Sequence, residues 1–217
     1  MITPPPAENQ SQNPPAVALE PGFEVVVQSF WDKNRNLILA ICAAILVGII
    51  GREGWQFYQA RHEQGVREDY AKVANRPEQL AAFASANSGH ALSGVAYLRL
   101  ADSKYAAGDF RSAAENYNKA VTSLKHSATL GRARIGAAMS QIYGSEKAAG
   151  ETALKAISVD ASLPKGARAE ATYHLATLAY EAGNATEVSR LVSEAGKIDP
   201  ASSWSQRATA LLTIKVQ

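Results

Sequence analysis

The feature that most limits how this chain can fold is an apolar run of fifteen residues without a charge or a proline, residues 37–51. As a helix this run would rise about 22 Å, which is short of the roughly 30 Å hydrocarbon core of a bilayer. Aromatic rings flank it where the two headgroup layers would lie, and the helix between those rings would rise roughly 36 Å. The sequence therefore predicts a membrane span over residues 36–58, with the anchor residues Trp31, Leu37, Leu46 and Trp55.

Two other interpretations of the apolar run fit less well. A core helix of a soluble protein would need a second apolar surface to cover it, and nothing else in the chain is as apolar. A cleaved secretory signal usually begins near the N-terminus and ends at a small-residue cleavage site. Here 36 residues precede the run, so we expect an uncleaved anchor in contact with the lipid bilayer.

The residues before the run form two segments. Residues 1–21 carry six of the nine prolines and few large apolar groups, a composition that predicts a disordered tail. In residues 22–35, apolar side chains recur at helical spacing, which would let one helical face lie on the membrane surface. A loose juxtamembrane linker fits this second segment equally well. The apolar positions are Phe23, Val26, Val27, Phe30 and Trp31.

Charge and cysteine content exclude some functions. The formal net charge is only +2, and the basic residues are spread along the chain rather than gathered in a stripe. This argues against a nucleic-acid-binding surface. The single cysteine, Cys42, lies inside the apolar run, so an intramolecular disulfide is impossible.

After the span, the chain is rich in alanine, and glycines stand near the expected helix ends, which predicts an all-α fold. We expect linking and capping helices over residues 59–90, with a break at Arg76 and Pro77. Residues 91–217 are expected to form a domain of about three repeats. A plain helical bundle is the alternative architecture.

Two stretches carry the repeat pattern, "YLRLADSKYAAGDFRSAAENYNKAV" at 97–121 and "YHLATLAYEAGNATEVSRLVSEAGKIDP" at 173–200. Both resemble the tetratricopeptide repeat, a helix–turn–helix unit of 34 residues. A weaker copy lies between them. The turn glycines Gly108, Gly144 and Gly183 are 36 and 39 residues apart, and three units are about the minimum for a stable stack. The predicted architecture is one transmembrane helix followed by a tetratricopeptide-repeat-like α-solenoid.

No motif for chemistry is present in the sequence. The four histidines fall in different predicted units, without a second ligand at metal-binding spacing. Neither a phosphate-binding glycine loop nor a nucleophile elbow occurs. We therefore expect no catalysis, no metal, no cofactor and no small-molecule substrate.

Repeats of this kind usually bind a peptide or a helix along the face formed by the first helix of each repeat. Tyrosines on that face suit a partly apolar partner, although two of them, Tyr105 and Tyr180, fit packing between helices as well. The predicted partner-binding groove consists of Leu98, Asp102, Tyr105, Arg134, Gln141, Tyr173, Thr177 and Tyr180.

The whole layout is similar to the YfgM-type family, ancillary subunits of the bacterial SecYEG translocon. The resemblance is carried by Phe30, Trp31 and Asn34 before the span, Gly51 and Trp55 after it, and the stretches 80–121 and 169–195. It implies a non-catalytic adaptor in the inner membrane that helps exported chains reach folding factors. The implied partners are the SecYEG translocon and a periplasmic prolyl isomerase or chaperone. The tail would be cytoplasmic and the C-terminal domain periplasmic.

The basic residues disagree with that orientation. Lys33 and Arg35 precede the span, whereas Arg52, Arg61 and Arg67 follow it, a count that favours a domain inside the cell. Long domains, however, cross the membrane largely regardless of flanking charge, so we keep the orientation of the family. The alternative function is a scaffold of another envelope assembly, such as a secretion, pilus or cell-wall machine.

Overall fold

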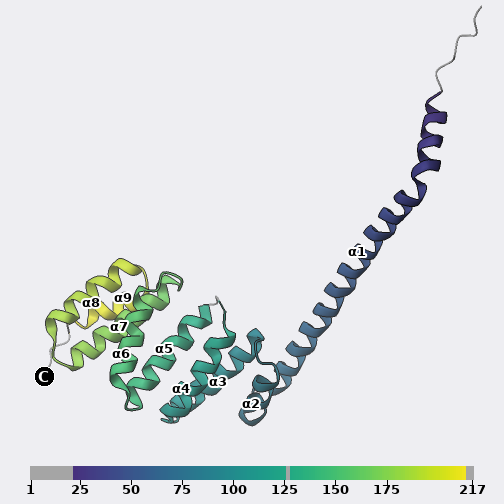
Figure 1. Cartoon of the computed structure of the whole chain (residues 1–217). Helices are drawn as coiled ribbons and strands as arrows, with labels where there is room; N and C mark the ends of the chain where they lie inside the picture. Colours follow the sequence, from purple (N-terminus) through teal and green to yellow (C-terminus); the bar gives the residue numbers. More distant parts are fainter. Residues whose placement is uncertain (1–21, 126–127, 214–217) are drawn as a thin grey trace, which may run out of the picture. The chain divides into compact units, whose positions relative to one another are not determined.

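The computed structural model of the chain describes residues 22–125 and 128–213. Within these ranges all regular structure is helical and no strand occurs, which confirms the predicted all-α class. The predicted Pro-rich tail, residues 1–21, lies outside the described residues. The chain divides into two compact units, residues 1–60 and residues 61–217 (Figure 1).

The first unit contains most of one long helix, α1 (Phe23–Val73). No proline interrupts this helix, and the apolar side chains of its middle part, such as Leu37 and Leu46, are exposed. Of the helices in the described part of the chain, α1 is the one long and apolar enough to cross a membrane. A helix that is apolar all round and has no protein cover is suited to lipid rather than to water.

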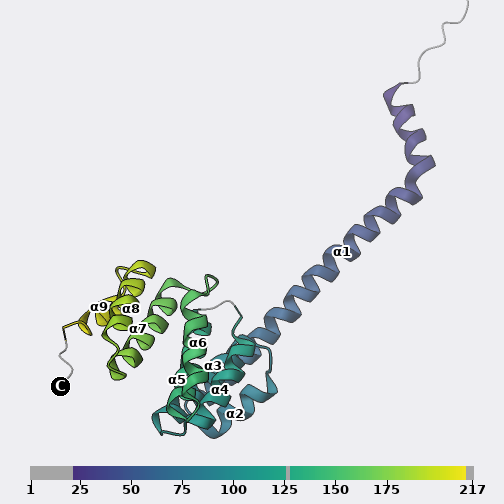
Figure 2. The ribbon, with the colours of Figure 1, turned by 60° about the vertical axis from the view of Figure 1, so that its left-hand side comes forward.

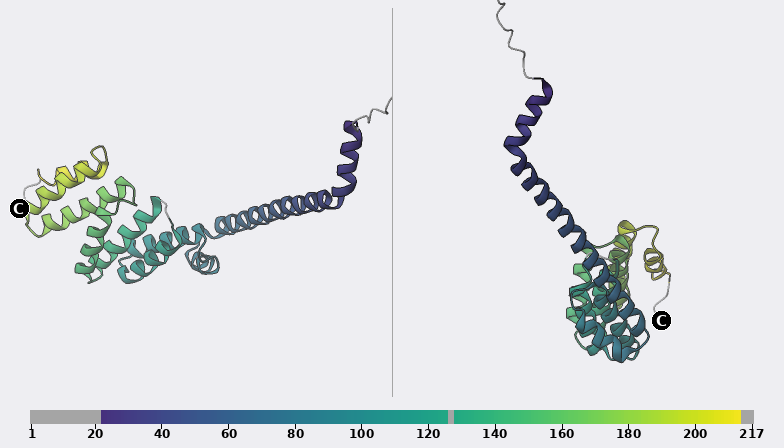
Figure 3. Two further views of the ribbon diagram at one scale, coloured as in Figure 1. Left: turned by 45° about the horizontal axis from the view of Figure 1, so that its top comes forward. Right: turned by 90° about the vertical axis from the view of Figure 1, so that its right-hand side faces the viewer.

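The N-terminal part of α1, purple in the figures, bends away from the rest of the helix (Figures 2 and 3). This part contains a polar segment, residues 32–36, between two apolar stretches. Within it Asn34 Nδ2 donates a hydrogen bond of 2.8 Å to the Phe30 carbonyl oxygen.

The second unit begins with the last turns of α1, from Arg61, and α2 (Pro77–Ala86). Pro77 stands in the first turn of α2, where a missing N–H costs nothing, and it confirms the predicted break. The Tyr70 ring packs on the Phe83 ring with 5.6 Å between centroids. These residues, with Val66, form the first layer of the unit's core.

Three helix–turn–helix pairs follow, as the sequence predicts (Figure 1). In the first and third pairs, the N-cap residues Asp109 and Asn184 accept a hydrogen bond from a backbone N–H of the second helix. The pairs are α3 (Ala91–Ala106) with α4 (Phe110–Ser123), α5 (Ala128–Tyr143) with α6 (Lys147–Val159), and α7 (Lys165–Glu181) with α8 (Ala185–Ile198).

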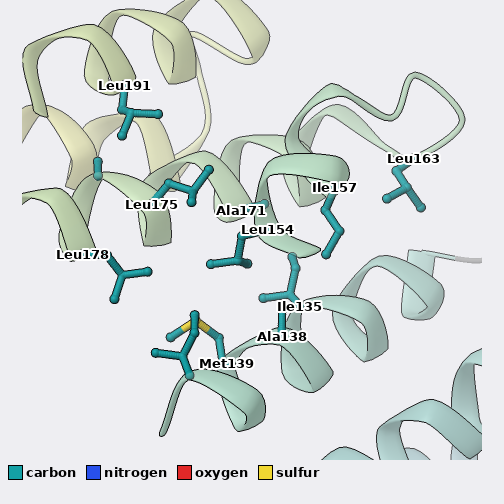
Figure 4. Packing of buried hydrophobic residues seen from close by; sticks show 12 residues of the cluster. Ile135, Ala138, Met139, Leu154, Ile157, Leu163, Ala171, Leu175, Leu178 and Leu191 are labelled. Atoms are coloured by element: carbon teal, nitrogen blue, oxygen red, sulfur yellow. The ribbon is translucent and has the colours of Figure 1, made fainter. Parts of the chain in front are cut away.

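Small side chains let the helices of these pairs approach closely. Ala101, Ala138 and Ala176 occupy equivalent positions on α3, α5 and α7, and all three are fully buried. Around Ala138 the core is filled by larger aliphatic side chains from α5 to α8, including Leu154 (Figure 4). The stack is thus held together by apolar contacts between neighbouring helices.

A last short helix, α9 (Ser203–Ala210), closes the described part of the second unit. Ala208 packs against the α8 side chains Val188 and Val192, whereas Gln206 and Thr209 are exposed. A polar outer side is what a terminal capping helix needs, because no further repeat covers it.

Candidate partner-binding surfaces

The first repeat places its three predicted groove residues in different environments. Leu98 is only 4% exposed and belongs to the core formed by α3 and α4. Tyr105 is half-buried, and its ring lies edge-on to the rings of Phe110 and Tyr143, at 5.3 and 6.3 Å between centroids. Burial raises the pKa of the Tyr105 hydroxyl. Tyr105 therefore keeps part of its ring at the surface, while Leu98 contributes packing.

Asp102, the third of these residues, connects three helices. Its Oδ1 accepts a hydrogen bond of 2.7 Å from the Tyr117 hydroxyl on α4, and its Oδ2 accepts one of 2.6 Å from Arg132 Nη2 on α5. Tyr117 is 5% exposed, and its burial, together with the Asp102 hydrogen bond, raises the pKa of its hydroxyl. Both oxygens of Asp102 are thus engaged inside the unit.

The second repeat has a register one residue later than the sequence predicts. The turn residue with positive φ is Ser145, with φ of 88°, and it corresponds to Gly108 and Gly183 in the other two turns. Gly144 has a different role: a Cβ there would lie 2.8 Å from the Ser140 carbonyl oxygen and 3.2 Å from Phe110 Cβ. The expected turn at Gly144 is therefore corrected to Ser145.

This register moves the predicted residues Arg134 and Gln141 away from the positions equivalent to Leu98 and Tyr105, which Ile135 and Ile142 occupy. Arg134 Nη1 donates a hydrogen bond of 2.8 Å to Asp160 Oδ2. Hydrogen bonds from Ser162, and then from Arg134, lower the pKa of Asp160. Whether Arg134 and Gln141 contact a partner stays a prediction.

In the third repeat, Tyr173 is half-buried, and its ring lies 5.5 Å from the Trp204 ring on α9. Thr177 Oγ1 donates a hydrogen bond of 3.1 Å to the Tyr173 carbonyl oxygen. Tyr180 packs against the core between α8 and α9. Of the three predicted residues, Tyr173 is the one whose ring joins an aromatic cluster with the capping helix.

Charged groups alternate along the first helices of the repeats. Asp102 on α3 pairs with Arg132 on α5. Glu170 on α7 lies within electrostatic reach of Arg132 and of Arg207 on α9. Burial raises the pKa of Glu170, whereas the two arginines act in the opposite direction. The resulting acid–base–acid–base order crosses α3, α5, α7 and α9.

His174 lies beside this charge series. Its Nε2 is 4.0 Å from Glu170 Oε1, and its ring lies 5.9 Å from the Trp204 ring. Burial lowers the pKa of His174 to about 4, so the imidazole is neutral at pH 7. The Arg207 guanidinium lies 4.7 Å above the Trp204 ring, within the range of a cation–π contact.

We call the surface carried by these side chains the first-helix face. It comprises Asp102, Tyr105, Arg132, Tyr143, Glu170 and Tyr173 of the repeats with Trp204 and Arg207 of α9. Sequence reasoning missed Arg132, Tyr143 and Glu170. Contacts between helices identify them: Arg132 pairs with Asp102, Glu170 lies within electrostatic reach of Arg132, and the Tyr143 ring contacts the Tyr105 ring. With Ser145 aligned to Gly108 and Gly183, Arg132 and Glu170 take the same repeat position as Val95.

Two hollows of the second unit are lined by residues outside the first-helix face. A groove of about 370 Å³ lies between α6, α7 and α8, with the floor residues Leu175, Leu178 and Leu191. Another, of about 390 Å³, lies between α4, α5 and α6 and contains Arg134 and Gln141. In residues 22–125 and 128–213, no group of three or more His, Cys, Asp or Glu side chains is arranged to hold a metal ion.

Comparison with known proteins supports the repeat assignment. Residues 28–170 match the family model described as a tetratricopeptide repeat-like domain. No curated protein and no solved structure matches the chain. Domains with this fold mediate protein–protein interaction and are typically non-catalytic. The match covers more than half of the chain, and the chain belongs to the tetratricopeptide repeat-like domain family.

Proposed function

We propose that this protein is a membrane-anchored, non-catalytic scaffold that holds a partner protein on the first-helix face. The observation that carries the proposal is the set of half-buried and exposed rings on this face, which runs over consecutive helices. Tyr143 is 53% exposed, and Tyr105 and Tyr173 keep part of their rings at the surface. Partly exposed aromatic rings on a rigid support are typical of energetically important contact sites.

The charges of the face indicate the chemistry of the partner. Asp102 and Arg132 neutralise each other, and Glu170 lies near two arginines, so the face has little net charge to offer. A strongly charged peptide would therefore gain little electrostatic binding energy on such a surface. A partly apolar segment, extended or helical, would gain more binding energy, because it buries aromatic surface without burying an unpaired charge.

Membrane anchoring by residues 36–58 of α1 is part of the proposal. Its support is the exposed apolar surface of this helix, with Trp31, Leu37, Leu46 and Trp55 all accessible. An apolar surface of this extent is unfavourable in water and marks a membrane or protein contact. The proposed organisation keeps a tail at residues 1–21, a juxtamembrane segment at 22–35, linking and capping helices at 59–90 and a repeat domain at 91–217.

The resemblance to the YfgM-type family gives the proposal its finer form. The protein would be an adaptor at the SecYEG translocon of the bacterial inner membrane, with its repeats in the periplasm. There it would link exported chains to a prolyl isomerase or chaperone. The alternative, a scaffold of another envelope assembly, uses the same anchor and the same face with a different partner.

The test is site-specific photo-crosslinking in intact cells. A photo-reactive amino acid replaces Tyr143, which is more exposed than Tyr105 and touches it. The matched control replaces Ser189, an exposed residue of α8 outside the first-helix face. We expect Tyr143 to capture a translocon subunit or a periplasmic folding factor, and Ser189 to capture neither.

Other outcomes separate the parts of the proposal. Equal capture at Tyr143 and Ser189 would exclude the first-helix face as the contact. Specific capture of a subunit of another envelope machine would support the alternative scaffold. Protease added to spheroplasts should digest the repeat domain, and a domain that stays protected until the membrane is lysed would place it in the cytoplasm.

A further inference from the structure

The N-terminal part of α1 carries an apolar stripe that lies before the proposed span, residues 36–58, and shares only Trp31 with the proposed anchor residues. Its positions follow the i, i+3, i+4, i+7, i+8 spacing that puts side chains on one face of a helix. The opposite face carries Gln28 and Ser29 with the apolar Val25 between them. The members of the stripe are Phe23, Val26, Val27, Phe30 and Trp31, all of them exposed.

The stripe lies close to the apolar run in the chain. From Trp31 to Leu37 the helix rises about 9 Å, and a headgroup layer is roughly 5–8 Å thick. The polar residues between them include Lys33 and Arg35, whose positive charges match the phosphates of lipid headgroups. If residues 36–58 cross the bilayer, the end of the stripe at Trp31 lies at the membrane surface. The stripe is then covalently tethered to that surface.

The bend decides how the stripe meets that surface. A straight helix along the membrane normal would carry Phe23 about 21 Å from the start of the apolar run, into water. The purple part of α1 instead turns away from the axis of the following part (Figure 3). With this bend, the stripe runs across the direction of the span, as in helices that lie in the interface plane.

We propose that residues 23–31 form an interfacial helix whose apolar stripe is buried in the headgroup layer of the membrane that α1 spans. This inference rests on the proposed membrane span. Its occupant is the lipid surface, because only five residues, 32–36, separate the stripe from the apolar run and the stripe is flanked by basic charge. The bent segment fixes the depth of the span at its N-terminal end, since sliding α1 along its axis would pull the stripe out of the interface.

The experiment is a spin-label accessibility scan of the full chain in vesicles of zwitterionic and anionic phospholipid. The native Cys42 is changed to alanine, and single cysteines are placed by Val27→Cys, Gln28→Cys and Leu46→Cys. Accessibility is measured to oxygen, which concentrates in lipid, and to a water-soluble nickel chelate. We expect label 27 to favour oxygen, label 28 to favour the chelate and label 46 to be reached by oxygen alone.

Three other accessibility patterns would contradict the proposal, each for a different reason. Label 46 reached by oxygen alone, with labels 27 and 28 both open to the chelate, would leave the span intact and overturn the interfacial helix. Label 27 shielded from both reagents would mean that protein covers the stripe, which also overturns it. Label 46 open to the chelate would refute the membrane span itself, and with it this inference.

Discussion

Tyr117 on α4 donates a 2.7 Å hydrogen bond to Asp102 on α3, and its ring rests against the backbone of Gly136 on α5. One buried side chain thus joins both helices of the first repeat to the first helix of the second. Asp102 also accepts from the exposed Arg132, so a polar connection continues along the first-helix face. The surface proposed to bind a partner is in this way built on the contacts that hold consecutive repeats together.

The members of this connection should contribute unequally to stability. Asp102→Ala leaves the buried Tyr117 hydroxyl without an acceptor and should lower the free energy of unfolding by about 1–3 kcal/mol. Tyr117→Phe leaves the half-exposed Asp102 to water and should cost about 1 kcal/mol. Arg132→Ala removes a side chain that is 64% exposed, and it should cost less than about 1 kcal/mol.

These differences are measurable by urea unfolding of the full chain in detergent micelles. Trp204 fluorescence reports on the repeat domain when Trp31 and Trp55 are replaced by phenylalanine in every variant. Equal losses for the three substitutions, or a larger loss for Arg132→Ala than for Asp102→Ala, would contradict the role assigned to the buried hydroxyl.

Two glycines of the repeat domain should respond oppositely to alanine. At Gly150 an added Cβ would overlap the Ala138 carbonyl oxygen, which is backbone and cannot rotate away. Gly150→Ala should therefore destabilise the protein by about 1–3 kcal/mol. At Gly196 an added Cβ meets nothing within 4 Å, and Gly196→Ala should stabilise helix α8 by up to about 1 kcal/mol.

The same urea unfolding measures both variants, and each serves as the control of the other because the chemical change is identical. A stabilising effect of Gly150→Ala would mean that α5 and α6 do not approach as closely as described. Loss of stability on Gly196→Ala would show an unrecognised contact on that side of α8.

His174 should make the repeat domain less stable in mild acid. Its pKa of about 4 in the folded protein lies below the value of about 6.5 in an unfolded chain, so unfolding takes up a proton between these values. Stability from neutral His174 is present above pH 6.5 and is lost as the pH falls toward 4. Between pH 7 and pH 5 the loss amounts to about 2 kcal/mol.

The measurement compares the free energy of unfolding at pH 7 and pH 5 for the original protein and for His174→Gln, which cannot gain the proton. Glu170, whose pKa is raised, acts in the opposite direction because its protonated form is favoured in the folded state. It is present in both proteins, so the difference isolates His174. An equal loss in both proteins would contradict the buried, neutral histidine.

The fold was largely predictable because it depends on local patterns. The apolar run at 37–51, the turn glycines Gly108 and Gly183, and the small residues Ala101 and Ala176 each impose one local requirement that the sequence shows directly. The three helix pairs followed from these requirements. The sequence pattern did not reveal which neighbouring atoms each glycine packs against in the folded protein.

The candidate site was predictable only in part, for a related reason. Gly144 lies in the turn, but one residue before the position with positive φ, and an added Cβ there would meet the Ser140 carbonyl oxygen and Phe110 Cβ of α4. Aligning the second repeat on Gly144 put Arg134 and Gln141 at the positions of Leu98 and Tyr105, which Ile135 and Ile142 occupy in the structure. Likewise, Trp204 joins Tyr173 only through the packing of α9 on α7. A single residue of register thus decided which side chains of α5 were assigned to the predicted groove.

The corrected register gives a reciprocal prediction at the turns. Ser145 has φ of 88° and Gly108 has φ of 76°, a left-handed conformation that disfavours side chains with a Cβ. Ser145→Gly should relieve this strain and stabilise the protein by about 1 kcal/mol, while Gly108→Ser should destabilise it by a similar amount. Gly144→Ser, one residue earlier, should be destabilising through contacts of the added Cβ with the Ser140 carbonyl oxygen and Phe110 rather than through φ. Urea unfolding of the three variants tests whether Ser145 or Gly144 is the left-handed residue of the turn. If it were Gly144, Ser145→Gly would not raise the free energy of unfolding.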